Sequence, residues 1–429
     1  MLPCIGTMLF TSIYGIVDGL CVSNFVGKTA FAAVNLIMPL PMLLGTIGFM
    51  LGTGGSAIVG ITLGEGDQKK ADRYFTLFLL AALISVSVLA VLGIVFLRPI
   101  AVLLGAKGEL LDYAVRYGRI LMVSLPTFAL QNMFQSFFVT AEKPHLGFWF
   151  TVGAGCTNMV LDVLMVGIWG WGVEGAAIAT FISQLVGGVL PVFYFIDRSN
   201  SSRLHLCKTS FYSKVLRDAC INGSSELMTN LSMSLVNILY NYQLLRLAGE
   251  NGVAAYGVIM YAAFLFVAVF VGYAVGSAPI VSFHYGARNH AEVHNLYRKS
   301  LRLIAVVAVT LTLASMFIIP CVARIFVGYD AELLALTSRA FRLYALSFLI
   351  MGFNVYASSF FTALGDGVTS ALISFLRTLA FQVIAILLLP LLLGIDGIWL
   401  AVTAAELAAL AVSAAMLLTK DKVFHYRKA

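Results

Sequence analysis

Twelve long apolar segments limit what this chain can fold into. Each is about 20 residues or longer, which is enough for a helix to cross the roughly 30 Å core of a bilayer. The segments fall at residues 2–25, 31–62, 74–97, 112–141, 146–168, 175–196, 215–246, 253–285, 300–321, 333–364, 368–392 and 397–419. Charged residues make up 11% of the 429 residues, against about 25% in soluble proteins. The sequence therefore predicts an all-α polytopic membrane protein with twelve transmembrane helices.

Lysine and arginine gather in alternate loops of this topology. If the N-terminus is cytoplasmic, the inner loops hold the basic segments at 69–73, 198–217, 288–302 and 420–428. The outer loops hold few basic residues, chiefly Lys28, Arg98, Lys107, Arg246 and Arg324. Because cytoplasmic loops carry an excess of lysine and arginine, both termini are predicted to be cytoplasmic. The same asymmetry explains the net charge of +7 without a nucleic-acid partner.

The second half of the chain repeats the first at an offset of about 222 positions. GKTAFAAVN at 27–35 matches GENGVAAYG at 249–257, and GVEGAA at 172–177 matches GIDGIW at 394–399. Further matches lie between these two in the same order. Ordered matches at a nearly constant offset indicate duplication of a six-helix half.

Because each copy has an even number of spans, the two copies share one orientation. We predict two pseudo-symmetric six-helix bundles around a central cleft. The N-terminal half is placed at 1–196, a cytoplasmic linker at 197–214 and the C-terminal half at 215–429. Two facing halves are typical of transporters that work by alternating access.

Polar residues interrupt the apolar segments of the first half. Asn158 and Asp162 are four residues apart, so in a helix they share one face. Asp18 in the first span and Thr180 in the sixth fall at a similar depth below the outer surface. Carboxylate, amide and hydroxyl oxygens together can bind a small cation or stabilise a proton on a carboxylate. The alternative is that the Asn/Asp pair only holds neighbouring helices together.

Three more charges lie at membrane depth in the second half. Arg377 and Glu406 are expected to pair with each other in a structural role. For Glu226 two interpretations stay open, a structural role or an acid that faces the cleft and attracts a cationic substrate.

No motif in the sequence points to a cofactor or to catalysis. The six cysteines show no CxxC or zinc-ligand spacing, and no HExxH motif or nucleophile–base pair is present. Gly27-Lys28-Thr29 lacks the first glycine of a phosphate loop, because position 22 is Val22. We predict a protein that is not an enzyme, has no cofactor, and draws energy from an ion gradient or a partner ATPase.

These residues resemble the multidrug and toxic compound extrusion (MATE) transporters, most of all the bacterial drug-efflux members. The strings that carry the resemblance are YGIVDG around Asp18, GSAIVGITLGEGD after the second span, TNMVLD around Asp162 and GVEGAAIAT ending at Thr180. The resemblance implies a secondary active antiporter of the bacterial plasma membrane that exports cationic or amphiphilic organic compounds in exchange for H⁺ or Na⁺. It also implies that Asp18, Asn158, Asp162 and Thr180 bind the coupling ion.

The expected partners are small lipophilic cations and the lipid bilayer, with no nucleic acid, and the protein is expected to be a monomer. We expect Asp18, Asp162 and Glu226 to contact the cationic substrate. Some members of the family carry an additional acid in the tenth helix, where this chain has Asn354. The alternative function is a flippase for lipid-linked saccharides or another amphiphile. A pyrophosphate cargo favours basic residues, which are nearly absent from the helices of the first half.

Overall fold

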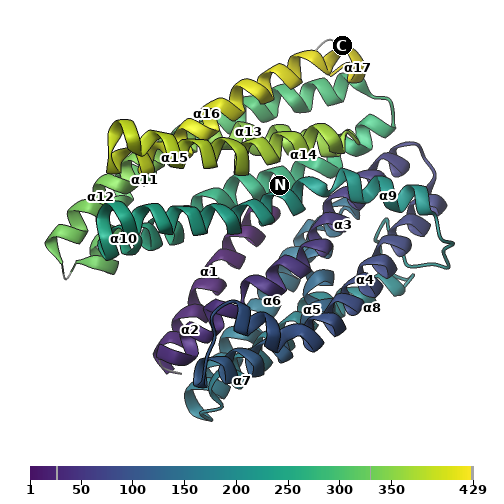
Figure 1. Ribbon diagram of the computed structural model, residues 1–429. Helices are drawn as coiled ribbons and strands as arrows, with labels where there is room; N and C mark the ends of the chain where they lie inside the picture. The colour runs from purple at the N-terminus through teal and green to yellow at the C-terminus, as the bar shows by residue number, and fades with distance from the viewer. Residues whose placement is uncertain (26–27, 329, 427–429) are drawn as a thin grey trace. The chain divides into compact units, whose positions relative to one another are not determined.

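The structure, a computed structural model, describes the backbone of residues 1–25, 28–328 and 330–426, and their side chains except those of 16–25, 28, 31, 322, 325 and 326. Within this part of the chain every regular element is a helix, as Figure 1 shows. The predicted all-α class is therefore confirmed. By its internal contacts the chain divides into two compact units, Met1–Gly223 and Ser224–Ala429.

The N-terminal unit begins at the purple end of Figure 1. Its described elements are α1 (Leu2–Phe25), α2 (Lys28–Ile37), α3 (Pro39–Gly64), α4 (Gln68–Leu103), α5 (Glu109–Thr140), α6 (Pro144–Asp162), the π-helix η1 (Val163–Ile168), α7 (Gly172–Gly188), α8 (Leu190–Ile196) and α9 (Ser213–Asn222).

The C-terminal unit begins with a helical segment that is broken once. Its described elements are α10 (Ser224–Gly286), α11 (His290–Val327), α12 (Ala331–Ala345), α13 (Phe348–Ala363), α14 (Gly367–Phe375), the π-helix η2 (Leu376–Ala380), α15 (Phe381–Leu393), α16 (Ile395–Thr419) and α17 (Asp421–Phe424). Inside α10, Gly249 has φ 60° and ψ −151°, a conformation open mainly to glycine. Two helices therefore meet at this residue.

Many of these helices are long and apolar enough to cross a bilayer. Among the described residues eight qualify, or nine if α12 and α13, which meet at 46°, form one bent span. This confirms a multi-pass membrane protein, whereas the number of twelve spans stays a prediction.

Several predicted spans are each divided between two helices, and two of these breaks have a clear cause. Within 31–62, α2 ends before Pro39, because proline lacks the N–H that would continue the helix and restricts the residue before it. Within 215–246, Gly223 separates α9 from α10. A Cβ atom on Gly223 would overlap the Met50 carbonyl of α3, so only glycine allows this approach. Through it α9 packs on α3 and belongs to the N-terminal unit.

The internal repeat of the sequence is also present in the caps at the N-termini of two equivalent helices, α4 and α11. The Asp67 carboxylate caps α4 by accepting from the Lys70 backbone N–H at 3.0 Å. The Asn289 side chain caps α11 in the same way, accepting from the Glu292 N–H at 3.1 Å. Both caps satisfy an N–H that a helix start leaves without a partner. The two units therefore begin equivalent helices with equivalent signals.

The predicted linker at 197–214 is held against the start of α4. The backbone N–H of His205 donates to Asp72 Oδ1 at 3.0 Å, and that of Cys207 donates to Thr76 Oγ1 at 3.1 Å. The Thr209 hydroxyl donates to the Arg73 carbonyl at 2.8 Å. These bonds fix the segment to the N-terminal unit. The domain limits named from the sequence stay a prediction.

Candidate functional site

Asn158 and Asp162 lie at the end of α6, where the α-helix changes into the π-helix η1. Their exposed fractions are 2% and 0%. Oδ1 of Asn158 has no hydrogen-bond donor among the described residues. A buried oxygen without a donor is costly, so such an atom needs a ligand or another explanation. Short π segments inside α-helices are frequent at functional sites.

Contacts between α1 and α6 show how the two helices are aligned. A Cβ atom on Gly6 of α1 would lie 3.0 Å from the Phe148 ring of α6, and one on Gly155 of α6 would lie 3.1 Å from the Tyr14 ring of α1. The contacts advance along both chains together, so the two helices run parallel. Asp18 lies one helical turn after Tyr14, and its backbone is therefore level with the Asn158–Asp162 turn. Its side chain lies outside the described residues.

Thr180 lies in α7, which packs against both α6 and η1. Its side chain is half-buried, and its hydroxyl donates to the Ala176 carbonyl at 3.0 Å. The hydroxyl proton is therefore used within the helix, while the oxygen lone pairs can still accept or coordinate. The helices that carry the four predicted ion-binding residues pack together. A common ion site formed by their side chains stays a prediction.

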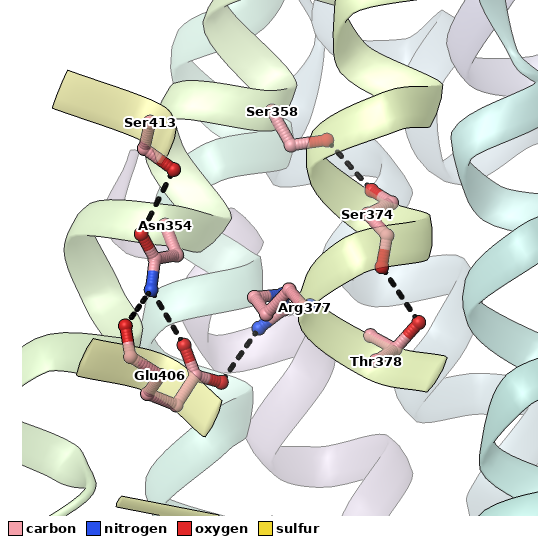
Figure 2. Close-up of polar contacts among 7 residues, drawn as sticks. All are labelled: Asn354, Ser358, Ser374, Arg377, Thr378, Glu406 and Ser413. Carbon is pink, nitrogen blue, oxygen red and sulfur yellow. Dashed lines mark hydrogen bonds and ion pairs between the residues drawn. The ribbon is translucent and has the colours of Figure 1, made fainter. Parts of the chain in front are cut away.

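A second buried acid, Glu406 in α16, is surrounded by hydrogen-bond donors in the C-terminal unit (Figure 2). Nη1 of Arg377 in η2 lies 3.3 Å from Oε1 of Glu406, which confirms the predicted pair. Nδ2 of Asn354 in α13 donates to Oε2 of Glu406 at 2.7 Å and to its backbone carbonyl at 2.9 Å. The Ser413 hydroxyl in turn donates to Oδ1 of Asn354 at 2.9 Å. Three helical segments thus hold one carboxylate.

The support of Glu406 by Asn354 and Ser413 could not be predicted from the sequence. The available signal was an asparagine at membrane depth in a segment rich in apolar residues. Its partner lies 52 positions away on another helix, so no local spacing joins the two.

Glu226, in the first turn of α10, is placed differently. Its side chain is half-buried, and its charge interacts with that of Arg377. In the described part of the chain no hydrogen bond or ion pair joins its carboxylate to another side chain. Glu406, with 1% of its side chain exposed, is the more buried of these two acids.

Hydroxyl groups connect α13 with α14 beside this cluster (Figure 2). The Ser358 and Ser374 hydroxyls are 2.9 Å apart, and the Ser358 and Ser370 hydroxyls 2.8 Å apart. The Thr378 hydroxyl donates to the Ser374 carbonyl at 2.7 Å. These bonds hold adjacent helices together and fix the start of η2, which carries Arg377.

A cavity of about 510 Å³ lies at the break in α10. It is lined by Asn241, Tyr242, Leu245, Glu250, Val253 and Ala254. None of the site residues predicted from the sequence lines it.

Comparisons with known proteins identify the family. The MatE family profile matches residues 3–164 and again residues 227–388, which agrees with the internal duplication. The multidrug export protein MepA of Staphylococcus saprophyticus is 22% identical over 98% of this chain and 92% of its own length.

Two solved structures share the fold. A crystal structure of MATE in complex with MaL6 superposes with a TM-score of 0.93 at 23% identity, covering 100% of this chain and 96% of that one. A MOP superfamily transporter from Pyrococcus furiosus, whose binding pocket of reverse polarity suggests a different function, gives a TM-score of 0.91 at 23% identity, covering 100% and 95%. Because its profile matches both halves, this chain belongs to the MatE family, which is a family of membrane transporters and not of enzymes.

Proposed function

We propose that the protein is a secondary active antiporter that exports cationic or amphiphilic organic compounds in exchange for H⁺ or Na⁺. The relatives named as multidrug export proteins support the cargo class. In this proposal twelve helices form two bundles that work by alternating access, and the protein acts as a monomer without a cofactor.

The observation that carries the proposal is the buried pair at the end of α6. Asp162 has no exposed surface, and beside it the Asn158 Oδ1 lacks a donor among the described residues. A carboxylate and an amide oxygen together favour a proton or a small hard cation. In our proposal Asp18 and Thr180 complete this ion site, and Asp18 and Asp162 also contact the cationic substrate.

Ion binding at this site gives the gradient a means to act on helix packing. Two carboxylates close together in a low dielectric repel each other unless a cation or a proton lies between them. Binding of the ion at this site therefore changes the interaction of α1 with α6. A ligand shifts an equilibrium between two conformations only if it binds one of them more tightly than the other.

Reconstituted vesicles test the proposal directly. The protein is inserted into liposomes loaded with ethidium, and pH and Na⁺ gradients are imposed separately. We expect one of the two gradients to drive dye transport, and Asp162→Asn to abolish that dependence. Equal transport with and without either gradient would refute ion coupling.

We further propose that the protein lies in the bacterial plasma membrane with both termini cytoplasmic. Ser201 is exposed in the linker and accepts a hydrogen bond from Lys143 Nζ at 2.8 Å. In a cysteine-free background, Ser201→Cys should react with an impermeant maleimide only after cells are opened. Strong labelling of intact cells would show that the linker lies outside the cell and that the proposed orientation is wrong.

A further inference from the structure

The segment 197–212, which joins α8 to α9, lies level with the ends of two predicted membrane spans. The Leu206 N–H donates to the Phe195 carbonyl at 2.9 Å, next to the end of the sixth predicted span. The Cys207 N–H donates to Thr76 Oγ1 at 3.1 Å, at the start of the third predicted span. These bonds place the segment where the apolar core of a bilayer meets the lipid headgroups.

A large apolar side chain of this segment faces outward. Phe211 is 75% exposed, although the residues around it are fixed to α4. The Thr209 hydroxyl donates to the Arg73 carbonyl at 2.8 Å, and the Tyr212 ring meets the Tyr74 ring edge-on with 5.5 Å between the ring centroids. The fold therefore holds a phenylalanine on its surface at the level of the headgroups, where apolar side chains insert into a membrane.

Helix α9 continues the same exposed face. Lys214 and Arg217 follow Phe211 at intervals of three residues and are exposed, and Ile221, four residues further on, is 42% exposed. Ala219 on the opposite face is fully buried where α9 packs on α3. Apolar and basic side chains that share one exposed face are typical of segments that lie in the headgroup region of a membrane.

Basic residues outnumber acidic residues around this face. Residues 67–73 and 208–218 hold six lysines and arginines against three aspartates. Asp218 pairs with Arg217 at 3.5 Å, and the other two aspartates accept hydrogen bonds from backbone N–H groups. Three exposed cations of this set form no ion pair in the described part of the chain: Arg73, Lys208 and Lys214. Their positive charge is available to an anion from outside the chain.

We propose that Arg73, Lys208, Phe211 and Lys214 form a binding surface for anionic phospholipids of the surrounding membrane. Phe211 inserts between the lipid headgroups, and the three cations bind their phosphates. A soluble acidic protein offers negative charge, but it does not offer an apolar layer at the level where the spans end. The surface ties this end of the N-terminal unit to the bilayer, and it depends on neither the ion nor the cargo of the proposed antiporter.

Spin labels on the full-length protein in vesicles test whether position 211 enters the membrane. Phe211→Cys is compared with Ser201→Cys, an exposed position of the same segment, in a cysteine-free background. The vesicles contain phosphatidylcholine and phosphatidylglycerol, and the readout is the accessibility of each label to oxygen relative to a water-soluble nickel complex. We expect a clearly higher ratio at 211 than at 201. Equal ratios would overturn the proposal and point to a surface for a soluble acidic partner.

Lipid binding by the purified protein in uncharged detergent tests the charges and keeps the natural cysteines. The probe is a short-chain phosphatidylglycerol. One basic residue near a lipid phosphate changes the affinity about fivefold, so Lys208→Gln/Lys214→Gln should raise the dissociation constant at least about tenfold. Phe211→Ser should raise it as well. The control Arg98→Gln/Lys107→Gln removes the same charge near the opposite end of α4 and should leave it unchanged.

The results that contradict the proposal are distinct from a failure of transport. An unchanged dissociation constant in either linker variant, or an equal rise in the control, overturns the lipid surface. Binding of glycerol phosphate as tightly as of the lipid also overturns it, because the site then takes a soluble phosphate. None of these measurements involves transport, so the lipid surface and the proposed antiport can each fail without the other.

Discussion

The two units place different polar groups beside a buried carboxylate. In the N-terminal unit, Asp162 lies one turn after an amide whose oxygen has no donor in the described part of the chain. In the C-terminal unit, Glu406 is surrounded by donors from Arg377 and Asn354. An acceptor oxygen beside a carboxylate favours binding of a cation. Hydrogen-bond donors around a carboxylate instead supply the positive partner that a bound cation would otherwise provide. In the second unit the positive partner of the carboxylate is therefore internal, whereas in the first unit an ion site at the Asn158–Asp162 turn is our proposal.

In our proposal this difference separates an ion-binding acid, Asp162, from a structural one, Glu406. A buried ion pair adds little net stability, but removal of one partner leaves an uncompensated charge. An acid that binds and releases an ion must instead be stable both with and without that ion. We therefore expect substitution of Asp162 to change transport, and substitution of Glu406 to change stability.

The largest effect is expected from Asp162→Asn. The change keeps the size of the side chain and removes its charge, so insertion should be normal while gradient-driven transport falls at least about tenfold, within the usual range of coupling energies. Efflux from vesicles under an imposed gradient measures it. Asp18→Asn is the companion variant. Wild-type rates with unchanged ion dependence in both variants would mean that these residues only hold helices together.

Glu406→Ala should show the reverse pattern. It leaves the Arg377 guanidinium buried without its carboxylate, which costs about 3–5 kcal/mol of stability. Thermal unfolding of the detergent-solubilised protein measures the loss. The double variant Arg377→Met/Glu406→Met removes both charges and should recover most of the stability. If Glu406→Ala unfolds at the wild-type temperature, the structural role of the pair is wrong.

Sequence patterns predicted the parts of this molecule that depend on local chemistry. Apolar segments predicted the helices, and the isolated charges of Arg377 and Glu406 predicted their pairing. The sequence did not reveal the support from Asn354, because a hydrogen bond between distant helices leaves no periodic trace. It also did not reveal that Gly223 packs on α3, since a glycine needed for close approach looks like a glycine in a turn.

Gly155→Ala should affect transport to an intermediate degree. Its Cβ atom would lie 2.5 Å from the Phe10 ring and 3.1 Å from the Tyr14 ring, so α1 must move away from α6. Such overpacking costs about 1–3 kcal/mol and disturbs the alignment of the Asp18 turn with the Asp162 turn.

Gly153→Ala on the same helix is the matched control for that change. The nearest atom to its Cβ, in Val186, is at an ordinary contact distance of 3.9 Å. Vesicle transport by the two variants, compared at equal protein, measures the difference. Equal transport would show that the α1–α6 contact does not position the ion site.

The smallest effect concerns the turns that begin α6 and α14, which are equivalent in the repeat. Asp366 caps α14 by accepting from the Thr369 N–H at 3.2 Å, and its carboxylate pairs with Lys420 at 2.8 Å. In the turn before α6, the residue that precedes the helix is Lys143, and its side chain provides no cap. Asp366→Ala should therefore lower stability by about 1 kcal/mol, while Lys143→Ala should change it by less than about 0.5 kcal/mol.

The pH dependence of this cap follows from the same contacts. Partial burial raises the pKa of Asp366, but the bonds from Lys420 and Thr369 outweigh it, so the pKa lies below its usual range. A carboxyl with a lowered folded-state pKa stabilises the fold above its unfolded value of about 3.9, and this contribution is lost as the pH falls below that value. Unfolding midpoints of wild type and Asp366→Ala should therefore differ at pH 7 and converge in acid. A difference that is the same at pH 7 and pH 3 would assign the effect to packing instead of to the charge.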